Sequence, residues 1–124
     1  MIPNSPFFGE ISTIIENEYW KCCYDKYPVS LGHVLVITKR LVKDYFECSI
    51  EEKKSLLSTI DEVCEYLKRK YQPDGFNIGM NIGKEGGQTI FHMHVHVIPR
   101  YRGDTPNPSG GVRGVIPNKQ NYDG

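Results

Sequence analysis

The sequence predicts an α+β domain with a mainly antiparallel sheet of about five strands, one long helix and a short helical segment. Three observations support this fold class. Five short segments are rich in β-branched and aromatic residues, one longer segment has helical periodicity, and the strand-like segments occur in runs around that helix. A chain of 124 residues also fits one compact domain rather than two.

The expected strands are separated by segments rich in glycine and proline. Pro28 and Gly32 predict a loop between the second and third strands, and Pro99 is expected to end the last one. We therefore expect a single domain over residues 1–124, with a core at about 13–104 and a Gly/Pro-rich tail at 105–124. The expected strands span residues 12–15, 19–24, 33–38, 76–82 and 90–98.

The long helix is expected to begin at Ser49. Its hydroxyl can cap the helix, and Glu52, three residues later, completes a capping box. Pro73 and Gly75 end the helix, and residues 42–47 predict a short helical turn before it. Apolar residues at three- and four-residue spacing form a stripe that should pack on the sheet. They are Leu56, Leu57, Ile60, Val63, Leu67 and Tyr71.

Charge and cysteine content exclude several classes of protein. With 15 basic and 15 acidic residues, the chain lacks the broad positive field that binds a nucleic-acid backbone. No segment approaches the ~20 consecutive apolar residues of a membrane span. The four cysteines include no Cys-x-x-Cys pair, and we expect free thiols in a reducing compartment. The sequence thus predicts a soluble cytoplasmic protein with no nucleic-acid or membrane partner.

Three of the four histidines lie within five residues of the last expected strand. His92, His94 and His96 alternate with apolar residues, so their rings should share one face of the sheet. Three neighbouring imidazoles would repel one another if all were charged. At least one should therefore be neutral at pH 7 and available as a nucleophile or a ligand.

Two chemistries can use this face. Neutral imidazoles bind zinc, although the motif contains no carboxylate and no cysteine pair to complete a tetrahedral set. Alternatively, one imidazole attacks phosphorus while the others orient it and hold phosphate oxygens. The loop at residues 86–89 favours phosphate, because its glycines let backbone N–H groups approach an anion. Gln88, Thr89 and Asn81 add neutral donors.

Residues 87–98 resemble the signature of the histidine triad (HIT) family, in which three histidines alternate with apolar residues after a Gly-Gln pair. Residues 28–37 are similar to the segment upstream of that signature, and residues 99–104 to its continuation in the diadenosine-polyphosphate-hydrolase branch. The resemblance extends over residues 13–104. It implies a HIT-like fold and a homodimer whose subunits join their sheets and bind a purine nucleotide or dinucleotide.

The resemblance also implies roles for individual residues. His94 would attack the α-phosphorus and form a nucleotidyl-histidine intermediate that water then cleaves. His92 and His33 would belong to the network that sets the tautomer of His94, His96 would contact phosphate, and Gln88 would face the leaving group. The residues expected to bind the nucleotide are Asp25 at the ribose and Asn81, Gly87 and Thr89 at the phosphates.

The implied function is that of a nucleotide hydrolase or nucleotidyl transferase. It would cleave the α-phosphate linkage of a dinucleoside polyphosphate or a nucleoside phosphoramidate. Two alternatives stay open, a zinc-dependent hydrolase and a nucleotide-binding module without turnover. Some members of the family hold a structural zinc with an amino-terminal Cys-x-x-Cys, which this sequence lacks. We therefore expect no bound metal and no cofactor.

Overall fold

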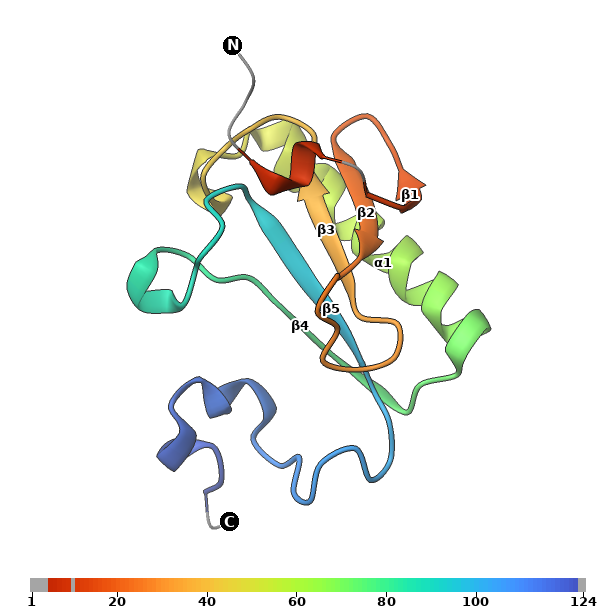
Figure 1. The fold of residues 1–124 in the computed structure, drawn as a ribbon, viewed down its shortest axis with the longest axis vertical. Helices are drawn as coiled ribbons and strands as arrows, with labels where there is room; N and C mark the ends of the chain where they lie inside the picture. The colour runs from red at the N-terminus through yellow and green to blue at the C-terminus, as the bar shows by residue number, and fades with distance from the viewer. Residues whose placement is uncertain (1–4, 10, 123–124) are drawn as a thin grey trace.

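The computed structural model describes residues 5–9 and 11–122, so the outermost ends of the expected domain lie outside it. It contains a five-stranded sheet and one long helix (Figure 1). The strand order is β1-β2-β3-β5-β4, and every neighbouring pair is antiparallel. The predicted α+β fold class is confirmed. The strands are β1 (Thr13–Glu16), β2 (Trp20–Tyr24), β3 (Val34–Thr38), β4 (Gly75–Gly79) and β5 (His94–Arg100).

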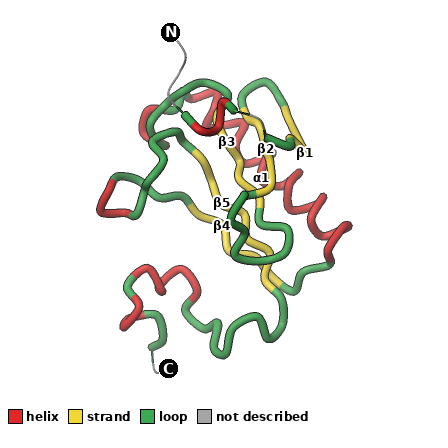
Figure 2. The backbone as a smooth tube through the Cα atoms, viewed as in Figure 1, coloured by secondary structure: helices red, strands yellow, loops and turns green. Residues whose placement is uncertain are grey.

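The two faces of the sheet have different covers. Helix α1 (Ile50–Tyr71) lies along one face, and its Val63 and Leu67 join the inward valines of β3 and β5 in one apolar cluster (Figure 2). On the other face, Phe7 packs in a second cluster with Leu35 and its neighbours. Phe7 belongs to a short 3₁₀ helix, η1 (Pro6–Phe8). Because strand side chains alternate, the chain places the helix and the N-terminal segment on opposite faces.

The helix begins with the predicted capping box. The Ser49 hydroxyl accepts a hydrogen bond from the N–H of Glu52 at 3.0 Å, and the N–H of Ser49 donates to the Glu52 carboxylate at 2.7 Å. Leu56 is buried as expected, but Leu57 is 73% exposed and Thr59 takes an inward position instead. Consecutive helical residues are about 100° apart around the axis, so Leu57 points away from the sheet.

The strand that carries the histidines differs from its predicted bounds. β5 begins at His94 rather than at residue 90. Its first residue, His94, pairs with Ile37 of β3, and β3 itself ends at the next residue, so residues before His94 have no strand to pair with. It also continues through Pro99 to Arg100. Pairing with β3 stops at Val97, and a proline, which lacks an N–H, is tolerated where a strand has a partner on only one side.

The remaining elements are shorter than the sequence predicts or were expected to be loop. β4 ends at Gly79 instead of residue 82, and the predicted helical turn at 42–47 is the 3₁₀ helix η2 (Tyr45–Glu47). A 3₁₀ turn, η3 (Lys84–Gly86), lies in the loop before β5. The tail contains two further 3₁₀ helices, η4 (Gly111–Val115) and η5 (Pro117–Lys119).

The four cysteines are free thiols, as the sequence predicts. Three of them, Cys22, Cys23 and Cys48, are buried. Over the part of the chain that the structure describes, none of the helices has the length and apolar character needed to cross a bilayer.

Candidate active site

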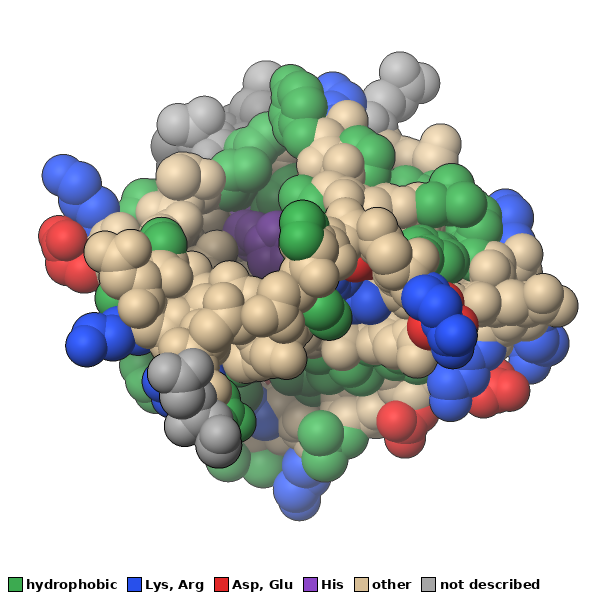
Figure 3. All heavy atoms as spheres, turned by 90° about the horizontal axis from the view of Figure 1, so that it is seen from below, with side chains coloured by type: hydrophobic (Ala, Val, Ile, Leu, Met, Phe, Trp, Pro, Cys, Tyr) green, Lys and Arg blue, Asp and Glu red, His purple; other side chains and the backbone are tan. Residues whose placement is uncertain are grey.

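The sheet brings three of the four histidines together on the face opposite α1. In β5, His94 and His96 alternate with the buried Val95 and Val97, as expected from the strand period. Each pairs with a residue of β3, and His33 immediately precedes that strand. The rings of His94 and His96 are 5.2 Å apart, and those of His96 and His33 are also 5.2 Å apart. Histidine is visible in a hollow on the face shown in Figure 3.

The hydrogen bonds of His94 define its tautomer. Its Nδ1 lies 2.7 Å from the backbone carbonyl oxygen of His92. A carbonyl oxygen only accepts hydrogen bonds, so Nδ1 of the neutral ring carries the proton. Nε2 of His94 is therefore left with its lone pair, which is the form that a nucleophile requires.

The neighbouring pair has the opposite arrangement. The N–H of Val29 donates to Nδ1 of His33 at 3.1 Å, so the proton of His33 is on Nε2. Nε2 of His33 then donates to Nδ1 of His96 at 3.0 Å, which leaves the proton of His96 on its own Nε2. A carboxylate oxygen of Asp25 lies 3.5 Å from Nε2 of His33. His96 thus offers a hydrogen-bond donor at Nε2 beside the lone pair of His94.

The site keeps these rings neutral at pH 7. Burial lowers the pKa of His94 and of His33, although Asp25 opposes the shift in both. Burial, followed by the like charges of His94 and His33, lowers the pKa of His96 to about 4. Because the three imidazoles are adjacent, a proton on one ring repels a proton on the next, and their titrations are coupled.

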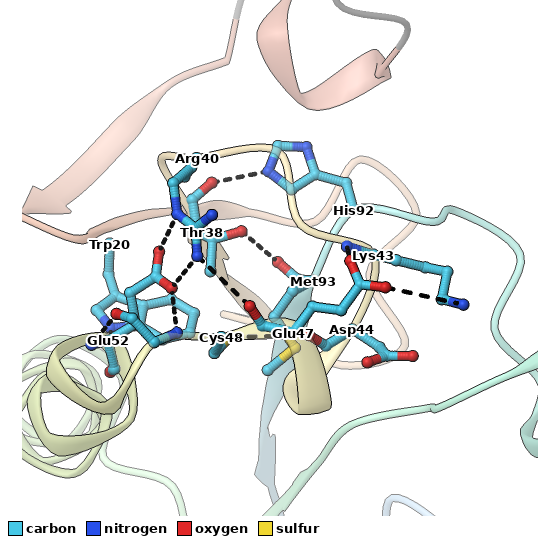
Figure 4. A network of polar contacts seen from close by, with 11 residues as sticks. Trp20, Thr38, Arg40, Lys43, Asp44, Glu47, Cys48, Glu52, His92 and Met93 are labelled. Carbon is cyan, nitrogen blue, oxygen red and sulfur yellow. Dashed lines mark hydrogen bonds and ion pairs between the residues drawn. The ribbon is translucent and has the colours of Figure 1, made fainter.

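His92 differs from the other two members of the motif. It precedes β5, is only 1% exposed, and its Nε2 lies 2.7 Å from the carbonyl of Thr38 (Figure 4). Its Nδ1 lies 2.6 Å from the hydroxyl of Ser5. The expected network therefore forms differently: the backbone of His92, not its ring, orients His94, and His33 orients His96 rather than His94.

A cavity of about 430 Å³ opens beside His94 and His96. Its polar lining includes five other residues that the sequence analysis predicts to belong to the site. Its apolar lining comes from the N-terminal segment, β2, β3 and the loop before β5. The polar residues are Asp25, Asn81, Gly87, Gln88 and Thr89, and the apolar residues include Pro6, Phe7, Ile11, Cys23, Leu35 and Ile90. A mostly apolar cavity with a few polar groups is typical of a small-molecule site.

A family model, described as the HIT domain, matches residues 10–103. The chain belongs to the HIT family. An AP-4-A phosphorylase of Mycobacterium tuberculosis is 35% identical over 79 residues, 63% of this chain and 40% of that protein. A bis(5'-adenosyl)-triphosphatase of Saccharomyces cerevisiae is 28% identical over 105 residues, 80% of this chain and 51% of that protein.

The fold of this HIT chain also matches solved structures. A HIT family protein from Bacillus anthracis has a TM-score of 0.77 and 33% identity, with 82% of this chain and 76% of that chain covered. The chain spans about 60% of the length of several other curated HIT relatives.

The side-chain amide of Gln88 is not free to contact a leaving group, which is the role that the resemblance implies. Its side chain is 4% exposed, and its Oε1 accepts from the N–H of Gly83 at 3.0 Å. Its Nε2 donates to the carbonyls of Lys43 at 2.7 Å and Ile90 at 3.1 Å. The amide is therefore occupied in holding the loop before β5. The exposed Asn81 makes no side-chain hydrogen bond to the described residues and lines the cavity.

Some residues that line this site were not predicted from the sequence as site residues. Cys23 and Leu35 are paired across β2 and β3, and Leu35 is paired with His96 across β3 and β5. Strand alternation could have identified them, because paired residues point to the same face. Ser5 gave no comparable signal, since its contact with His92 depends on tertiary folding alone.

One group of this HIT chain has the composition of a cation site. Asp25, His33 and His96 offer ligand atoms that lie within 4.8 Å of one another. A histidine nitrogen must have a free lone pair to bind a metal. Both nitrogens of His33 are already used, Nδ1 by the N–H of Val29 and Nε2 as the donor to His96. The hydrogen bonds therefore oppose a zinc ion at this position.

Proposed function

We propose that the chain is a nucleotide hydrolase or nucleotidyl transferase that acts through a nucleotidyl-histidine intermediate on His94. The scissile bond is the α-phosphate linkage of a dinucleoside polyphosphate or a nucleoside phosphoramidate. The opposite tautomers of His94 and His96 carry this proposal. A lone pair on one ring and an N–H group on its neighbour, both lining one cavity, supply a nucleophile and a hydrogen bond that stabilises the leaving group.

The reaction balances with the groups in the cavity. Nε2 of His94 attacks the α-phosphorus and forms a P–N bond while the bond to the leaving group breaks. The N–H at Nε2 of His96 donates a hydrogen bond to that leaving group, which departs with the bonding electron pair and takes any proton it needs from solvent. Water then attacks the same phosphorus, the P–N bond breaks with its electron pair returning to Nε2 of His94, and the proton lost by the water goes to solvent. The sum is the substrate plus water giving a nucleoside monophosphate and the released group.

The same proposal assigns the binding groups. Asn81, Gly87 and Thr89, which line the cavity, contact phosphate oxygens, and Asp25 accepts from the ribose hydroxyls. Gln88 supports the loop that carries Gly87 and Thr89. The relatives named for AP-4-A and bis(5'-adenosyl) triphosphate chemistry support a nucleotide substrate.

We propose that the chain works as a cytoplasmic homodimer. The resemblance implies that subunits join their sheets, and β4, at one edge of the sheet, offers an unpaired side for such an interface. Free buried thiols suit a reducing compartment. The net charge of zero supports a nucleotide rather than a nucleic acid as the ligand.

The decisive experiment combines His94→Ala with product identification. The wild-type protein is incubated with diadenosine tetraphosphate or adenosine phosphoramidate, with and without chelator or phosphate. Wild type should release AMP or a nucleotide adduct, and His94→Ala should lose at least about a thousandfold in turnover while still binding AMP. Free imidazole should restore turnover to His94→Gly.

Each alternative has its own outcome in that experiment. Full turnover by His94→Ala would reject the nucleophile, and loss of wild-type turnover on chelation would favour a zinc-dependent hydrolase. AMP binding without turnover of any probe would indicate the non-catalytic nucleotide-binding module.

A further inference from the structure

The N-terminal segment at residues 5–9 lies over the ring of His92 (Figure 4). The rings of Phe7 and Phe8 are 5.4 Å and 5.0 Å from that imidazole, and Phe7 is also 5.0 Å from His94. Ser5 caps η1, because its hydroxyl accepts from the N–H of Phe7 at 3.2 Å. The segment therefore contacts both the buried histidine and the one that faces the cavity.

The direction of the contact between Ser5 and His92 follows from the partners of the ring. Nε2 of His92 lies 2.7 Å from the carbonyl of Thr38, so it carries the proton of the neutral ring. Burial lowers the pKa of His92, which keeps the ring neutral. Nδ1 is then an acceptor, and the Ser5 hydroxyl at 2.6 Å donates to it. Both ring nitrogens of His92 are used, and neither is available for proton transfer in the cavity.

This hydrogen bond has no substitute within the described chain. The other hydrogen bonds of residues 5–9 to described residues stay inside the segment: Phe7 N–H to Ser5, Phe8 N–H to Ser5 and Gly9 N–H to Pro6. The segment belongs to no sheet. Apart from apolar packing, Ser5 is thus its one polar attachment to the described remainder of the domain.

The attachment matters because the segment forms part of the cavity. Pro6 and Phe7 line it, and Phe7 packs with Leu35 and Cys23 of the sheet, which line it as well. Phe7 is only 9% exposed, so it closes that apolar side against water. A segment held less firmly would leave this side open for part of the time and would weaken contacts to the part of a ligand that does not react.

We propose that Ser5 is a positioning residue: its hydroxyl, donated to Nδ1 of His92, fastens the N-terminal segment over the cavity and so strengthens nucleotide binding. His92 is the anchor for this segment and takes no part in proton transfer. The inference rests on the function proposed above for the cavity. The chemical step does not depend on Ser5, because the carbonyl of His92 orients His94.

The test compares Ser5→Ala with Ser5→Thr, which keeps the hydroxyl, and with Ser58→Ala, which changes an exposed serine of α1. Loss of one hydrogen bond should raise the KM for diadenosine tetraphosphate about three- to tenfold in Ser5→Ala. Its kcat should stay within about twofold, the pattern of lost binding to a non-reacting group. Ser5→Thr and Ser58→Ala should match wild type. Hydrogen exchange at residues 5–9 should be faster in Ser5→Ala alone.

Other outcomes overturn the inference. Unchanged KM and unchanged exchange in Ser5→Ala would show that the hydroxyl fastens nothing. A fall in kcat at constant KM would place Ser5 in the chemistry instead. If wild type turned over no probe, the proposed function would fail separately, and AMP binding would decide: a three- to tenfold weaker Kd in Ser5→Ala supports the positioning role, and an equal Kd refutes it.

Discussion

Gln88→Ala removes three hydrogen bonds, two within the loop before β5 and one from that loop to the chain that follows β3. The side-chain oxygen of Gln88 accepts from Gly83, and its nitrogen donates to the carbonyls of Lys43 and Ile90, at distances between 2.7 and 3.1 Å. These contacts span up to 45 residues of sequence. Alanine would leave one backbone donor and two backbone acceptors without their partner.

The magnitude follows from the burial of the amide. Each hydrogen bond contributes about 1 kcal/mol net, and a buried group left without a partner costs about 1 to 3 kcal/mol. Gln88 is 4% exposed, but the space left by its side chain adjoins the open cavity, where water can satisfy part of the loss. We therefore expect Gln88→Ala to lower the free energy of unfolding by about 2 to 4 kcal/mol.

The assay is urea unfolding, with Asn81→Ala as the matched amide deletion. Asn81 is exposed in the same cavity, so its removal should change stability by less than about 0.5 kcal/mol while it weakens turnover or nucleotide binding. The reasoning is refuted if Gln88→Ala loses less than about 1 kcal/mol, the value of a single hydrogen bond. Native stability with collapsed turnover would instead restore the leaving-group role that the resemblance implies for Gln88.

Two further predictions concern the stability of the fold. The free energy of unfolding should fall as pH decreases from about 6.5 towards 4. Burial lowers the pKa of all four histidines in the folded state. In this pH range the unfolded chain therefore binds protons on its histidines that the folded chain does not bind. Equal urea midpoints at pH 7 and pH 5 would contradict this. Ser49→Ala should cost about 1 to 2 kcal/mol by removing the helix cap. Its kcat/KM should equal that of wild type, since α1 covers the other face of the sheet, and a change in activity would show that the helix start is coupled to the site.

Features encoded by neighbouring residues were predictable from the sequence. The capping box at Ser49 needs only two residues three positions apart, and the common face of His94 and His96 needs only strand periodicity. The α+β fold class followed from the same local patterns. For this reason the position of the long helix and the two histidines at the cavity could be foreseen without coordinates.

Other features depend on residues far apart in the chain. The length of β3 decides where β5 begins, and hence that His92 lies before the strand with its ring buried. Whether an amide points into the cavity or into the protein, as with Asn81 and Gln88, depends on which backbone groups lie nearby after folding. The Ser5 to His92 hydrogen bond joins residues 87 positions apart. Local propensity carries no information about such contacts, because only the packed chain brings the two groups within reach.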